Sequence, residues 1–144
     1  MATQDSLELV RRYAAEVWGG DDPANPDVLR RFLSPSFQRH TSAAAPPLDR
    51  ETQIERLQGI KVAFPDISIT PDDFIAEDDR VAMRATLRGT HGGDFMGIPP
   101  TGKEVTATIV DVIRVEDGQF AEQWGGPDVF DMLRQVGATV SGPV

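Results

Sequence analysis

The stretch EVTATIVDVIRVEDG, residues 104–118, decides the expected fold. From Val105 to Val115 the odd-numbered positions are apolar with one exception, whereas the even-numbered positions include two threonines and an arginine. Alternation with a period of two is typical of a β-strand that buries one face. The exception is Asp111, which places a carboxyl group in the middle of the apolar face.

Three neighbouring segments also alternate, contain β-branched residues and are bounded by turn sequences, namely residues 66–79, 80–95 and 119–125. Together with residues 104–118 they predict a meander of about four antiparallel strands. The N-terminal half has helical periodicity, which predicts helices at residues 4–18, 27–33 and 49–64 and leaves SFQRH, residues 36–40, as a brief strand. We therefore expect an α+β fold in which a curved antiparallel sheet wraps around three N-terminal helices.

A short C-terminal helix is expected over residues 128–137, ending at Gly137. The chain has 144 residues and no linker-like or repeated segment, which predicts a single domain over residues 1–144. The N-terminal sequence MATQDSLELV lacks the basic and apolar regions of a signal peptide, and no apolar run is long enough to span a membrane. These features predict a soluble, cytoplasmic protein.

Composition excludes several classes of function. There are 14 Lys and Arg against 23 Asp and Glu, a formal charge of −9, which disfavours nucleic acid and anionic membrane surfaces as partners. The chain has no cysteine, so thiolate chemistry and cysteine-ligated metals are excluded. The two histidines, His40 and His91, form no compact metal-binding motif. We expect neither a metal nor a cofactor.

Asp111 is the most informative candidate for catalysis. An ionised carboxylate on a buried face is costly, so Asp111 should be protonated with a raised pKa, hydrogen-bonded, or facing a cavity. The first and third of these states are those of catalytic acids. The alternative is a structural ion pair with an arginine such as Arg84 or Arg88.

The segments FPD (64–66), DRVAMRATLRGTHGGDFMGIPPTGK (79–103) and IRVEDGQFAEQW (113–124) resemble the SnoaL-like polyketide cyclase family. This family belongs to the cone-shaped α+β superfamily named for nuclear transport factor two, with ketosteroid isomerase, scytalone dehydratase and limonene epoxide hydrolase. The resemblance implies a cone-shaped fold, acid/base chemistry without a cofactor, an aspartate acid/base in the C-terminal part of the chain, and dimers formed through the outer sheet face. The string IVDVIRVEDG also resembles the ketosteroid isomerase segment with the protonated aspartate of its oxyanion hole.

Two other residues are candidate partners of Asp111. His40 follows the strand SFQRH, and the resemblance implies a histidine near the pocket mouth, where a neutral imidazole acts as a base or donor. On the last strand Glu122 and Trp124 are expected to share a face with Phe120. Each of these residues also has a structural alternative. His40 would then be hydrogen-bonded to the backbone, Glu122 would be an ion-paired residue at the edge of the sheet, and Trp124 would be a core residue.

Most bulky apolar side chains in globular proteins lie in the core, but some of those in this chain should line a cavity between the helices and the sheet. The candidate substrate-binding residues are Trp18, Trp124, Tyr13, Phe64, Met83 and Phe95. Such a lining suits a hydrophobic small molecule. Apolar Val110 and Val112, on the face opposite Asp111, predict a homodimer formed through the sheet.

The expected function is an acid/base-catalysed intramolecular aldol cyclisation, or a related isomerisation, of a hydrophobic carbonyl compound. Asp111 is the expected acid or oxyanion donor, with His40 or Glu122 as its partner. Two alternatives stay open at this point: a non-catalytic protein that binds an apolar ligand, and an isomerase, dehydratase or epoxide hydrolase that uses the same pocket.

Overall fold

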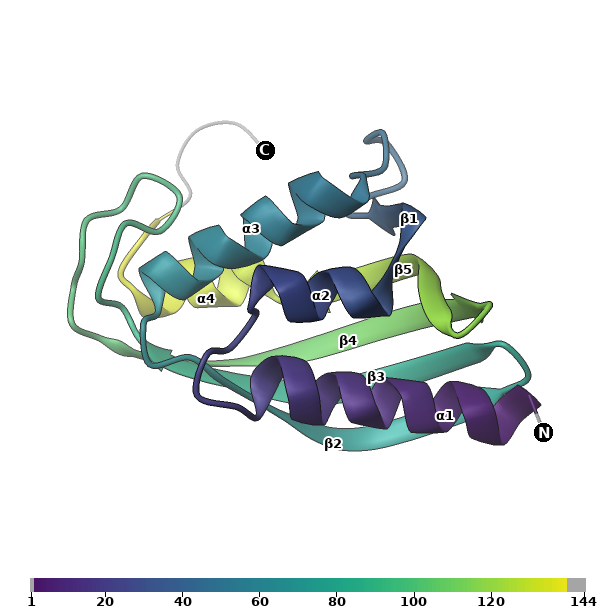
Figure 1. The fold of residues 1–144 in the computed structure, drawn as a ribbon. Helices are drawn as coiled ribbons and strands as arrows, with labels where there is room; N and C mark the ends of the chain where they lie inside the picture. Colours follow the sequence, from purple (N-terminus) through teal and green to yellow (C-terminus); the bar gives the residue numbers. More distant parts are fainter. Residues whose placement is uncertain (1, 140–144) are drawn as a thin grey trace.

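A computed structural model describes residues 2–139 of the chain. Three helical regions of the N-terminal half lie together on one side of a curved sheet (Figure 1). They are α1 (Ala2–Tyr13), which continues as the π-helical turn η1 (Ala14–Trp18), then α2 (Pro26–Phe32) and α3 (Arg50–Ala63). The short helix α4 (Val129–Gln135) follows the last strand. The predicted α+β fold with helices on the inner face of the sheet is confirmed.

Local sequence signals explain the helix starts. The side chain of Asn25 accepts hydrogen bonds from the backbone of Asp27 and Val28, and Pro26 occupies the first position of α2. Asp49 caps α3 in the same way, through the backbone N–H of Thr52. The expected helix at 27–33 ends one residue earlier, because Leu33 is already extended and begins a strand.

The five strands are β1 (Leu33–His40), β2 (Ser68–Glu77), β3 (Arg80–Thr90), β4 (Glu104–Glu116) and β5 (Gln119–Pro127). Their order in the sheet is β1-β5-β4-β3-β2. Strands β2 to β5 form the predicted antiparallel meander, but β1 pairs with β5 in parallel. The expectation of a purely antiparallel sheet is therefore wrong at this edge, because α3 and the meander separate the two strands in the chain and carry β5 back to run alongside β1.

A β-bulge in β5 changes which side chains face the helices. Val115 pairs with Phe120, but Arg114 pairs with Glu122, so one extra residue, Ala121, lies between the pairs. An extra residue reverses the alternation of a strand beyond it. Phe120 and Gln123 both face the interior as a result, and both are buried.

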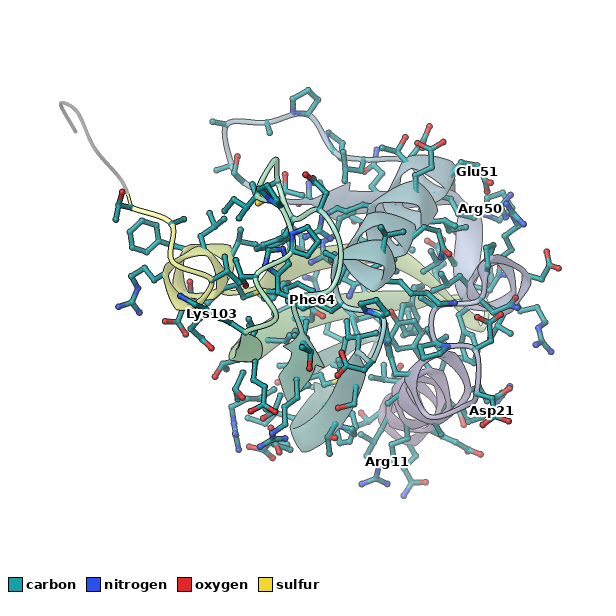
Figure 2. All side chains as sticks on the ribbon, turned by 90° about the vertical axis from the view of Figure 1, so that its left-hand side faces the viewer. Arg11, Asp21, Arg50, Glu51, Phe64 and Lys103 are labelled. Atoms are coloured by element: carbon teal, nitrogen blue, oxygen red, sulfur yellow. The ribbon has the colours of Figure 1, made fainter. Side chains whose placement is uncertain are left out.

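The core lies between the helices and the inner face of the sheet. The helical regions contribute buried residues such as Val10, Val17, Leu29 and Leu57. The strands contribute buried residues such as Phe37, Val81, Leu87 and Ile113. Figure 2 shows the contrast along α3: Phe64, just past the end of the helix, lies in the interior, whereas Arg50 and Glu51 lie at the surface at the beginning of the helix.

Candidate functional site

A small cavity lies between η1, α3 and the inner face of the sheet, with a volume of about 40 Å³. Its walls are mainly apolar and include Trp18, Leu57, Ile69, Met83 and Ile109. Its polar lining consists of Tyr13, Arg39, Gln53, Arg56, Asp111 and Gln123. A mainly apolar wall with a few convergent polar groups is the usual composition of a small-molecule site.

Asp111 is 6% exposed and lines this cavity from the middle of β4. Its carboxylate Oδ1 lies 3.3 Å from Nη2 of Arg39, which is 2% exposed. Burial raises the pKa of Asp111 above its ordinary value, although the charge of Arg39 and a hydrogen bond with Gln123 act in the opposite direction. Asp111 therefore combines a buried position, a raised pKa and access to a cavity.

The cation beside Asp111 is neither of those expected from the sequence. Arg84 is an exposed residue whose guanidinium lies 3.8 Å from Asp72, and Arg88 is also exposed. Both occupy even-numbered positions of β3, on the face of the sheet opposite the cavity. An arginine from β1 takes the place beside Asp111, because the parallel pairing aligns Arg39 with Gln123, on the inner face of β5.

Two glycines allow Arg39 to reach across β5. Gly125 pairs with Asp111, and the guanidinium of Arg39 donates a hydrogen bond to the Gly125 carbonyl. A Cβ atom on Gly126 would lie 2.7 Å from Nη2 of Arg39, and one on Gly125 would lie 2.0 Å from the Val110 carbonyl oxygen. Both glycines have positive φ angles, 100° and 137°, which L-residues rarely adopt. The Gly-Gly pair thus makes room for the cation.

The π-helical turn η1 places Tyr13 and Trp18 on one wall of the cavity. In a π-helix the backbone bonds join residues five apart, so residues 13 and 18 come onto the same face. Burial raises the pKa of Tyr13 to about 12, partly offset by a hydrogen bond with Trp18. Because the indole N–H can only donate, the Tyr13 oxygen is the acceptor in this bond.

Arg56 extends from α3 to the same polar lining. Its Nη1 lies 3.4 Å from Oε1 of Gln53, which is one helical turn earlier and 2% exposed. Burial lowers the pKa of Arg56, and the nearby positive charge of Arg39 lowers it further. Arg39, Gln53, Arg56 and Gln123 were not identified from the sequence. The alternation of Phe37 with Arg39 on an apolar strand face was the available signal.

The structure brings His40, Glu122 and Trp124 together, but on the outer face of the sheet. Nε2 of His40 lies 2.8 Å from Oε2 of Glu122, and the His40 ring stacks on Trp124 with centroids 5.1 Å apart. The hydrogen bonds from His40 and Arg114 lower the pKa of Glu122. The expectation that Glu122 and Trp124 share a face with Phe120 is wrong, because the bulge at Ala121 intervenes.

Of the other candidate lining residues, Tyr13, Trp18 and Met83 line the cavity, whereas Phe64 and Phe95 lie outside it. Those two rings pack against each other, with centroids 5.2 Å apart, and both contact the buried ring of His91. Nδ1 of His91 lies 2.9 Å from the Thr101 hydroxyl, so this cluster joins the loop after β3 to the end of α3.

Between residues 2 and 139, no group of three or more His, Cys, Asp or Glu side chains is arranged to hold a metal ion. The same part of the chain contains no helix that is both long and apolar enough to cross a membrane.

The fold and the cavity define the class: an α+β protein with a buried carboxyl group facing an apolar pocket between helices and sheet. The chain belongs to the SnoaL-like polyketide cyclase family, whose model matches residues 8–136. The resemblance seen in the sequence is thereby confirmed.

Two named relatives and a solved structure agree with this assignment. The chain is 26% identical over 133 residues to aklanonic acid methyl ester cyclase DauD of Streptomyces sp. (strain C5), covering 91% of this chain and 81% of that protein. It is also 26% identical to a second aklanonic acid methyl ester cyclase, DnrD of Streptomyces peucetius, and the match covers 95% of this chain and 92% of that protein. IdmH of Streptomyces antibioticus, a candidate polyketide cyclase, superimposes with a TM-score of 0.76 at 32% identity, covering 92% of this chain and 99% of its own.

Proposed function

We propose that this protein catalyses an intramolecular aldol cyclisation of a hydrophobic polyketide-type compound that carries at least two carbonyl groups. One observation carries the proposal: Asp111 is a buried carboxyl group with a raised pKa that faces an apolar cavity. Membership of the SnoaL-like family and the cyclase names of DauD and DnrD support the same reaction class.

In the proposed reaction, the Asp111 carboxylate removes a proton from a carbon next to a carbonyl group. The electron pair of the C–H bond forms an enolate, whose oxygen accepts a hydrogen bond from the Tyr13 hydroxyl. The enolate carbon attacks the second carbonyl carbon of the same molecule and forms the new C–C bond. The resulting alkoxide takes the proton back from Asp111, so the product is an isomer of the substrate and no cofactor is consumed.

The environment of Asp111 suits this role. A carboxylate with a raised pKa is a stronger base than an exposed aspartate, and proton transfer by a positioned group contributes about 10²- to 10⁴-fold. The high pKa of Tyr13, about 12, keeps its hydroxyl protonated and able to donate. Holding the two carbonyl-bearing segments together supplies a further ~7–11 kcal/mol of barrier reduction.

Entry of a polycyclic substrate requires the cavity to open. Its volume is about 40 Å³, whereas pockets for such ligands usually measure about 300–1,000 Å³. The half-buried lining residues Arg56, Ile60 and Ile69 mark the side nearest to solvent. Substrate therefore enters by displacing side chains between α3, η1 and the start of β2.

The direct test offers two first substrates, aklanonic acid methyl ester, which is the compound in the names of DauD and DnrD, and its free-acid form. Liquid chromatography with mass-spectrometric detection follows a product of unchanged mass and changed retention time. Asp111→Asn should lower turnover by about 10²- to 10⁴-fold, whereas Asp73→Asn, at an exposed position of β2, should not. Full turnover by Asp111→Asn would refute the assignment of Asp111, and tight binding without conversion by the wild type would favour a binding protein.

The outer face of the sheet supports the homodimer as a second proposal. Paired residues form a continuous row across four strands: Ile75 with Ala82, Ala82 with Val112, and Val112 with Trp124. Ile75 is 69% exposed, and Val110, on the same face, is 52% exposed. A two-fold symmetric contact between two such faces would cover this apolar row.

A further inference from the structure

The polar lining of the cavity carries more positive than negative charge. Arg39 and Arg56 converge there: a Cβ atom on Gly126 would lie 2.7 Å from Nη2 of Arg39 and 3.6 Å from Nη2 of Arg56. Asp111 is the single acidic residue among those that line the cavity. With Asp111 ionised the lining has one unbalanced positive charge, and with Asp111 protonated it has two.

This imbalance is unusual for a protein of formal charge −9. Arg56 forms no ion pair within the described part of the chain, and its one side-chain hydrogen bond is the long contact with Gln53. Nε of Arg39 is buried and has no hydrogen-bond partner among residues 2–139. Charged groups removed from water are costly unless an opposite charge or a hydrogen-bond acceptor compensates them. Among the described residues the lining supplies one carboxylate, that of Asp111, for two guanidinium groups.

We infer that the substrate of this site carries a free carboxylate, which Arg56 binds at the cavity mouth. The inference rests on the proposed function and names its substrate class. A guanidinium group pairs with a carboxylate through two parallel hydrogen bonds, which fixes orientation as well as affinity. Arg56 lies at the half-buried side of the cavity, while Asp111 lies deeper on β4. A carboxylate held by Arg56 therefore directs the apolar carbonyl-bearing part of the substrate towards Asp111 and Tyr13.

Binding of a matched pair of probes tests this without any catalytic step. The probes are 2-naphthoate and methyl 2-naphthoate, which share a ring system and differ in the ionised group. Isothermal titration calorimetry should give ~10-fold or tighter binding of 2-naphthoate than of its ester to the wild type. Arg56→Gln should remove this preference by weakening binding of 2-naphthoate, while binding of the ester stays unchanged.

Arg50→Gln is the matched control, since it removes the same charge from the same helix at the surface position visible in Figure 2. Its preference for 2-naphthoate should equal that of the wild type. Equal binding of acid and ester by the wild type, or binding of neither, overturns the inference. An equal loss in Arg50→Gln and Arg56→Gln also overturns it, because the effect would then be one of net charge.

The result is separable from that of the cyclisation assay. If the preference for the acid depends on Arg56 but no carbonyl compound is converted, the carboxylate site stands and the cyclase proposal fails. If aklanonic acid methyl ester or its free acid is cyclised while neither the wild type nor Arg56→Gln distinguishes 2-naphthoate from its ester, the cyclase proposal stands and the carboxylate site is overturned.

Discussion

Arg39 and Asp111 lie 72 residues apart in the chain, yet Nη2 of Arg39 is 3.3 Å from Oδ1 of Asp111 in the interior. The arginine comes from the strand at one edge of the sheet and crosses β5 over the two glycines at 125 and 126. The polar part of the cavity therefore depends on the parallel pairing of β1 with β5. The nearby guanidinium group of Arg39 also explains why the Asp111 carboxyl group is tolerated on the buried face of β4.

The two faces of the sheet should respond differently to substitution. Tyr13→Phe should lower turnover by ~10²-fold, the usual effect of losing one donor to a developing oxyanion. Glu122→Gln should leave turnover nearly unchanged, because Glu122 lies on the outer face and binds His40 and Arg114 there. Steady-state measurements of kcat for both variants compare the two faces directly. A loss in Glu122→Gln as large as that in Tyr13→Phe would move the reaction to the outer face.

The raised pKa of Asp111 should appear in the pH dependence of stability. The folded state holds this proton more tightly than the unfolded state, whose pKa lies near the ordinary value of 3.8. The contribution of Asp111 to stability is thus fully present below about pH 4 and is lost as pH rises through the raised folded-state pKa.

Urea unfolding of wild type and Asp111→Asn across this pH range measures the effect. The difference in unfolding free energy, wild type minus variant, should decrease as pH rises, and the other carboxylates cancel in that difference. A difference that grows with pH would mean that the folded state prefers the ionised carboxylate.

The glycines beneath Arg39 should be sensitive to a single added methyl group. Gly126→Ala should destabilise the protein by about 1–3 kcal/mol, because φ is +137° and the new Cβ would approach the Arg39 guanidinium. Gly59→Ala is the control: it lies inside α3, where an added Cβ would meet open space, and should stabilise the protein by about 0.5–1 kcal/mol. Thermal unfolding monitored by circular dichroism compares the two. Equal stabilities would mean that the Arg39 crossing imposes no constraint.

The homodimer proposal predicts a concentration-dependent mass in analytical ultracentrifugation. Val110→Glu places a charge on the outer sheet face and should yield monomers. Val62→Glu changes a similarly exposed valine on α3 and should leave the dimer intact. A wild-type monomer at micromolar concentration contradicts the proposal.

Local pattern was sufficient to predict much of the fold and one central residue of the site. Alternation along residues 104–118 placed Asp111 on the buried face, and helical periodicity with capping residues located α1, α2 and α3. These features depend on residues near one another in the chain, where side-chain direction follows from the repeat of the backbone. Tyr13, Trp18 and Met83 were assigned to the cavity because bulky apolar residues on inward faces meet between the layers.

Tertiary structure decided which charges surround Asp111 and on which face the second half of β5 lies. Alternation along β3 puts Arg84 on the outer face, and alternation along β1 puts Arg39 on the same face as Phe37. No local signal shows that Arg39 reaches Asp111, because that contact follows from the parallel pairing of β1 with β5, two strands that α3 and the meander separate in the chain. One extra residue at Ala121 moved Glu122 and Trp124 to the outer face, since alternation has a period of two and a bulge inverts it. The sequence by itself thus determined that a carboxyl group lies on the buried face of β4. The tertiary structure determined which two guanidinium groups lie near it, one from β1 and one from α3.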